Sequence, residues 1–163
     1  MNSEETLLSC LQQLNDEEVL RLQKIVREVE GSRHQECFIL GTYLAQINQL
    51  EEALDLLAIA VGGDPKNSDY HCNLGVVEHK LNLLETAKLS LQLSIQLNPQ
   101  NTDALYNLGK VYKDLNLKNE AVKTYKNVLE IDDSRFDAHL NLGNLLFELG
   151  SYDEAIKHYK RSI

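Results

Sequence analysis

The stretch TDALYNLGKVYKDLNLKNEAVKTY, residues 102–125, decides the fold of this chain. In it, Gly109 follows a leucine, an alanine stands twelve residues after the glycine, and Tyr125 stands sixteen residues after it. The two small residues allow two short helices to approach closely, and Tyr125 fills the space left between them. Asn116 marks the turn between the helices, because asparagine tolerates the left-handed conformation that closes a helix.

This pattern recurs with a period of 34 residues. The glycines are Gly41, Gly75, Gly109 and Gly143, and the alanines are Ala53, Ala87, Ala121 and Ala155. The large apolar residues are Leu57, Leu91, Tyr125 and Tyr159, and the turn residues are Asn48, Asn82, Asn116 and Gly150. A fixed period of about 20–50 residues is typical of solenoid proteins. The sequence therefore predicts consecutive helix pairs, with the second helices ending at Asp64-Pro65, Asn98-Pro99 and Asp132-Asp133. Gly62-Gly63 is expected to loosen the end of the first of these second helices.

These residues resemble the tetratricopeptide repeat, which places a Leu-Gly pair in its first helix, an alanine in its second and a proline near its end. The resemblance implies an all-α fold, a right-handed α-solenoid of stacked antiparallel helix pairs. Four units are expected, at residues 34–67, 68–101, 102–135 and 136–163, the last incomplete. Residues 1–33 are predicted to form an N-terminal helical hairpin, either a cap or a degenerate repeat.

Charge and composition exclude several functions. The net charge of −9 opposes binding to nucleic acids and to anionic membranes. The acidic N-terminus lacks the pattern of a secretory signal, and three cysteines without metal-ligand spacing suit reduced thiols in the cytoplasm. His71 and His139 are interpreted as core or boundary histidines. We therefore predict no metal site, no cofactor and no catalytic residues.

The resemblance implies that the first helix of each unit lines a concave groove that receives an extended or helical peptide. An asparagine recurs there in three units and can hydrogen-bond a peptide backbone, although it also belongs to the pattern of the repeat. The predicted site residues are Asn73, Asn107, Asn141, Lys110, Lys113, Asn144, Tyr106, His79, Asp69 and Asp103, and Cys72, Val76 and Phe147 are expected to share the groove. The aspartates, with Asp137, either stabilise helix starts or favour basic peptides.

One subclass of the family clamps a C-terminal carboxylate with a set of lysine and arginine residues. At the matching positions this chain has Phe38, Thr42, Asp103 and Asn107, so that function is not expected. The main hypothesis is a non-catalytic scaffold that binds a protein or peptide. One alternative is the N-terminal arm of a larger enzyme, for example a glycosyltransferase. The other is a structural protein that self-associates through an uncapped C-terminal end.

Overall fold

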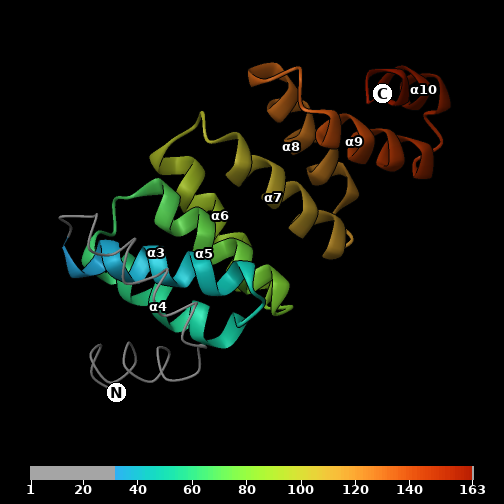
Figure 1. Ribbon diagram of the computed structural model, residues 1–163. Coiled ribbons are helices and arrows are strands. Elements are labelled where there is room, and N and C mark those ends of the chain that lie inside the picture. The colour runs from blue at the N-terminus through green and yellow to red at the C-terminus, as the bar shows by residue number, and fades with distance from the viewer. Residues whose placement is uncertain (1–31, 163) are drawn as a thin grey trace.

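The structure, a computed structural model, describes residues 32–162 and contains helices and no strands within that range (Figure 1). The helices are α3 (Arg33–Gln46), α4 (Leu50–Gly63), α5 (Ser68–Lys80), α6 (Leu84–Leu97), α7 (Thr102–Asp114), α8 (Lys118–Ile131), α9 (Phe136–Glu148) and α10 (Tyr152–Arg161). The all-α prediction is therefore confirmed. The predicted N-terminal hairpin lies outside the described residues, apart from its last two positions.

The helices stack as successive pairs (Figure 1). Each odd-numbered helix packs on the even-numbered helix that follows it, and each even-numbered helix packs on the next odd-numbered one. The first helices of neighbouring pairs also contact one another, α3 with α5 and α5 with α7, whereas no two second helices make a comparable contact. The first helices therefore lie on the inner side of the solenoid. We call the surface formed by α3, α5, α7 and α9 the first-helix groove.

The turns inside the pairs have the predicted left-handed conformation. Asn48, Asn82, Asn116 and Gly150 have φ angles of 64°, 60°, 59° and 79°. After Asn82 the chain reverses, and the Leu83 amide donates to the Glu78 carbonyl at 2.8 Å. That bond satisfies a carbonyl that the end of α5 would otherwise leave open. The turn chemistry predicted from the sequence is confirmed at all four places.

The predicted loosening at Gly62-Gly63 is wrong. Helix α4 continues through both glycines and ends at Gly63, before Asp64. A Cβ on Gly63 would clash with the side chain of His34 on α3, whereas a Cβ on Gly62 would meet nothing within 4 Å. Gly63 is therefore required by close contact between two helices and does not weaken the helix end.

Candidate functional site

The three recurring asparagines lie on successive first helices, α5, α7 and α9. The Nδ2 atoms of Asn73 and Asn107 each donate to a carbonyl one turn earlier on the same helix, at 2.9 Å. Asn141 Nδ2 donates to the hydroxyl of Tyr106 on the preceding first helix, also at 2.9 Å. The described residues offer no hydrogen bond to the three Oδ1 atoms. All three asparagines are half-buried. The side-chain NH2 group of each is held by a hydrogen bond, so its Oδ1 atom can accept a hydrogen bond from a ligand.

Two lysines on α7 carry positive charge in the same groove. Neither Lys110 nor Lys113 forms an ion pair within residues 32–162. Lys110 Nζ lies 6.0 Å from the centre of the Tyr106 ring, a separation at the edge of cation–π range. On α9, Asn144 is exposed and accepts a hydrogen bond from the Tyr159 hydroxyl at 2.9 Å. The exposed Phe147 lies one turn further along the same helix.

Two residues predicted for the groove are less available than expected. His79 Nε2 lies 2.6 Å from Asp114 Oδ2, and only 13% of the His79 side chain is exposed, so it mainly joins α5 to α7. The placement of Cys72 in the groove is wrong, because this side chain is buried in the core between α5, α6 and α7. Burial, with smaller contributions from Asp103 and Asp69, raises the pKa of the Cys72 thiol to about 12. A thiol held protonated in this way is a poor nucleophile.

An arginine that sequence analysis did not single out ties α7 to α9. Arg135 Nη1 lies 2.7 Å from Asp103 Oδ1, and Arg135 also donates to both carboxylate oxygens of Asp137 at 3.1 Å and 3.0 Å. Its guanidinium carbon lies 4.9 Å from the centre of the Tyr106 ring. Hydrogen bonding to Asp137 raises the pKa of Arg135, and the same bond lowers the pKa of Asp137. Asp103 is thus already neutralised by the protein itself.

Asp69 differs from the other aspartates of its row. It is exposed and forms no ion pair within the described residues, and its Oδ1 accepts only a long hydrogen bond of 3.3 Å from Asn101 Nδ2. All three aspartates lie in the first turn of their helices, where the helix dipole favours negative charge. The dipole therefore accounts for their positions, while Asp69 alone retains an open carboxylate.

His71 and His139, which stand two periods apart in the sequence, lie in the core, as predicted. His71 is 5% exposed and its Nε2 lies 2.9 Å from the Pro65 carbonyl. His139 is 1% exposed and its Nε2 lies 3.1 Å from the Asp133 carbonyl. Each ring joins a first helix to the loop before it. Within residues 32–162 no group of three or more His, Cys, Asp or Glu side chains is arranged to hold a metal ion.

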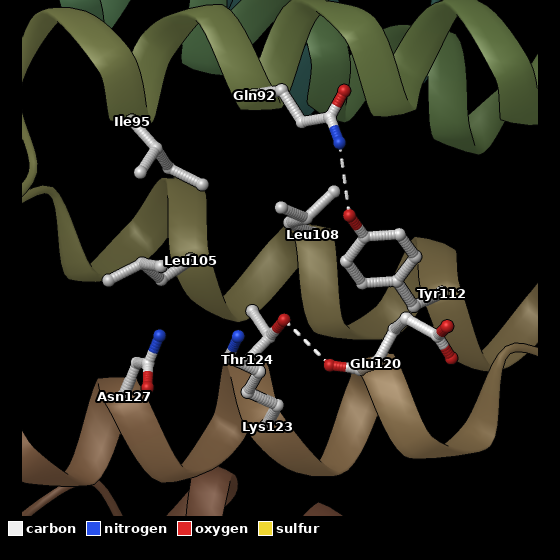
Figure 2. A pocket seen from close by; sticks show the side chains of 9 residues that line it. All are labelled: Gln92, Ile95, Leu105, Leu108, Tyr112, Glu120, Lys123, Thr124 and Asn127. Atoms are coloured by element: carbon white, nitrogen blue, oxygen red, sulfur yellow. Dashed lines mark hydrogen bonds between the residues drawn. The ribbon is translucent and has the colours of Figure 1, made fainter.

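A pocket of about 320 Å³ is lined by residues of α6, α7 and α8 (Figure 2). It lies between α6 and α8, which do not pack closely on one another, and its floor is formed by α7. Gln92 Nε2 donates to the Tyr112 hydroxyl at 3.0 Å across one edge. The lining residues are Gln92, Ile95, Leu105, Leu108, Tyr112, Glu120, Lys123, Thr124 and Asn127. Its walls mix apolar side chains with polar and charged ones, among them Glu120 and Lys123.

No helix in the described part of the chain is both long and apolar enough to cross a membrane.

Comparison with known families identifies the repeat. Two family models, both described as the tetratricopeptide repeat, match residues 68–101, 102–135 and 136–163. These residues make up more than half of the chain. A search of curated protein sequences found no match.

Solved structures with the same fold share little sequence with this chain. MamA is 24% identical with a TM-score of 0.77, over 86% of this chain and 82% of that chain. The first tetratricopeptide domain of Spaghetti (RPAP3), bound to the HSP90 peptide SRMEEVD, is 24% identical with a TM-score of 0.71, over 75% of this chain and 97% of that chain. The Arabidopsis OM64 tetratricopeptide domain is 16% identical with a TM-score of 0.70, over 71% and 96%. At this level of identity the likeness shows the fold.

Proposed function

Because the chain belongs to the tetratricopeptide repeat family, we propose that it is a non-catalytic scaffold that binds a peptide segment of another protein in its first-helix groove. The observation that carries this proposal is the asparagine row. Asn73, Asn107 and Asn141 each present an Oδ1 acceptor without a partner in the described part of the chain, from three rigid helices in a line. A peptide backbone offers N–H donors along its length, so such a row suits an extended segment of any sequence.

The groove combines this backbone recognition with mixed charge. Lys110 and Lys113 are free to meet a carboxylate of the ligand, and Asp69 is free to meet a cation. Since hydrogen bonds hold the three asparagine side chains before a ligand arrives, they lose little conformational entropy on binding. The charges are exposed, so binding is expected to be of modest affinity and to weaken with added salt.

The ligand differs in chemistry from the acidic peptide bound to the Spaghetti domain. In tetratricopeptide domains that clamp a C-terminal carboxylate, basic residues line the site, and this chain has Phe38, Thr42, Asp103 and Asn107 at the matching positions. Asp103 is also paired with Arg135. We therefore propose an internal or basic segment as the ligand.

A pull-down from cytosolic extract tests the groove. The parent chain is compared with the variant Asn73→Ala, Asn107→Ala, Asn141→Ala and with a control variant on the second helices, Gln96→Ala, Asn119→Ala, Asn127→Ala. Circular dichroism establishes that all three are equally helical. A partner kept by the parent and the control and lost by the groove variant supports the proposal. A partner retained equally by all three would place binding elsewhere.

Self-association is a second proposal, supported by the apolar surface of the last pair. Leu140 stands one period after Tyr106, and α9 covers Tyr106 whereas no described helix covers Leu140. The exposed apolar residues of this pair are Phe136, Leu140, Phe147, Leu149, Tyr152 and Ile156. A second copy would bury this surface and gain hydrophobic stabilisation. Sedimentation over a concentration series tests it: a monomer at every concentration would eliminate the idea, and a dimer lost in Leu140→Asp would support it.

We also propose a cytoplasmic location, from the state of the thiols. Cys37 and Cys72 are both buried and unpaired within residues 32–162. Unpaired thiols persist in reducing compartments, whereas oxidising ones favour disulfides. Cell fractionation followed by detection of the native chain tests this assignment.

A further inference from the structure

The junction between α7 and α9 shows how this repeat holds a cation. There, the guanidinium of Arg135 lies over the ring of Tyr106, at 4.9 Å from its centre, and pairs with the carboxylates of Asp137 and Asp103. An aromatic ring on one first helix and a carboxylate at the start of the next first helix thus form two walls of one cation site. The cation comes from the residue that precedes the second of these helices.

The same positions recur two periods earlier, at the junction of α3 with α5, without a cation. Phe38 occupies the position of Tyr106, and Asp69 that of Asp137. Asn67 stands where the later junction has its arginine. Asn67 caps α5, since its Oδ1 accepts from the amide of Asp69 at 3.0 Å. The aromatic ring and one of the two carboxylates are therefore kept, Gln35 stands in place of Asp103, and the arginine is replaced.

A pocket of about 270 Å³ lies at this junction. Its lining residues are Gln35, Phe38, Ile39, Asn67, Asp69 and Tyr70. Tyr70 stands where the later junction has an alanine, and its buried ring stacks on Phe38 with centroids 4.5 Å apart. Asp69 is the exposed carboxylate of the row that has no ion pair.

We propose that this α3–α5 pocket receives the cationic end of an arginine or lysine side chain carried by the bound peptide. The inference rests on the proposed function and specifies one subsite of the same groove. The cation lies against the half-buried ring of Phe38, which is backed by the buried ring of Tyr70, and pairs with Asp69, as Arg135 does with Tyr106 and its carboxylates. Arginine is preferred over lysine, because its planar guanidinium both stacks on a ring and bonds a carboxylate in a bidentate manner. The net charge of −9 also attracts a basic segment.

Two-dimensional NMR of the 15N-labelled full chain tests the pocket, with capped hexa-arginine and capped hexa-glutamate peptides as probes at low salt. The arginine peptide is expected to shift the amides of Phe38, Asp69 and Tyr70, and the glutamate peptide is expected to leave them in place. Asp69→Asn should weaken the arginine effect by about threefold, the size expected for loss of one exposed ion pair. The matched control is Asp55→Asn, which makes the same charge change at an exposed position on α4 and should leave the titration unchanged.

A second variant supplies the missing cation from the chain itself. Asn67→Arg recreates the residue found at the later junction, so its side chain should fill the pocket and abolish the arginine-peptide shifts at Phe38 and Asp69. Equal weakening by Asp69→Asn and Asp55→Asn, or unchanged shifts in Asn67→Arg, would overturn the proposal, as would shifts confined to other helices. A pull-down partner that needs the asparagine row but not Asp69 would reject the pocket and leave the groove standing. A partner that binds the parent and the triple asparagine variant equally would contradict the proposed groove function, whatever the result of the peptide titration.

Discussion

Tyr125 lies so close to Gly109 that a Cβ on residue 109 would come within 2.7 Å of the tyrosine Cε1. Tyr125 is fully buried, so its ring fixes the distance between α7 and α8. In the same way, a Cβ on residue 75 would come within 2.7 Å of Leu91 Cγ, and the glycines of the first and last pairs face Leu57 and Tyr159 similarly. Each 34-residue unit therefore repeats one close contact, in which a large side chain on the second helix packs against a glycine on the first.

Replacing this glycine by alanine should destabilise the protein. The added methyl group must displace the rigid ring of Tyr125, and overpacking costs about 1–3 kcal/mol, against a gain of at most about 1 kcal/mol from helix propensity. We expect Gly109→Ala to lower the free energy of unfolding by about 1–2 kcal/mol, measured by urea denaturation. Gly62→Ala is the control, because a Cβ there meets nothing within 4 Å and should stabilise α4. Equal effects of the two substitutions would contradict the role given to Tyr125.

The sequence predicted those helix contacts and turns that depend on the residue type at a single position. A glycine opposite a large residue and an asparagine in a left-handed turn are each recognised from residue type and spacing. The structural roles of Gly109 and Asn116 could therefore be predicted from the sequence. The groove was predicted less well. Cys72 is adjacent to Asn73 in sequence but about 100° further around the helix, which turns it into the core. Arg135 precedes its helix, where helical periodicity gives no side-chain direction, so its contacts could not be read from spacing.

Arg135 should control the titration of Asp137. The hydrogen bond from Arg135 holds the pKa of Asp137 below its usual value. A carboxyl with a lowered folded pKa adds stability above its unfolded pKa of about 3.9, and that stability is lost as pH falls through the folded pKa. In Arg135→Gln we expect the pKa of Asp137 to rise toward its ordinary value, measured by carbon NMR of the carboxyl group. Near neutral pH the variant should lose about 0.5–1 kcal/mol of stability, since these pairs are partly exposed. An unchanged Asp137 titration would contradict this account.

Glu78 is a buried carboxyl that should cost stability when ionised. It is 8% exposed, and its Oε2 has no hydrogen-bond partner within the described residues. Burial raises its pKa, opposed by hydrogen bonds from Ser90 and Thr86. The stabilising contribution of a raised carboxyl pKa is present below the unfolded pKa of about 4.3 and is lost as pH rises through the folded pKa.

We therefore expect the neutral variant Glu78→Gln to be more stable than the parent at pH 7, by about 1 kcal/mol. The difference should shrink toward pH 4, where both side chains are uncharged. Thermal unfolding across this pH range measures it. Glu130→Gln, at an exposed position on α8, is the control and should show little change at either pH. If Glu78→Gln were less stable than the parent at pH 7, the ionised carboxylate would have a stabilising interaction in the folded protein, which would contradict this account.

The contact between His139 and His158 should make the last pair sensitive to mild acid. Their Nδ1 atoms lie 2.9 Å apart, so one Nδ1 can donate a hydrogen bond to the other as long as one of the two nitrogens carries no proton. Burial lowers the pKa of His158, and the neighbouring His139, Lys126 and Arg161 lower it further, against the opposing charge of Glu154.

Because the folded pKa of His158 lies below the unfolded value of about 6.5, the unfolded chain takes up this proton first. Stability is fully retained above about pH 7 and falls as pH drops through the unfolded pKa toward the folded one. In His158→Gln this loss should be smaller, while the amide can still bond the ring of His139. Unfolding midpoints measured at pH 7.5 and pH 5.5 compare the two proteins. Parallel losses in parent and variant would show that other groups cause the acid sensitivity, since His158→Gln removes the titratable ring at this position.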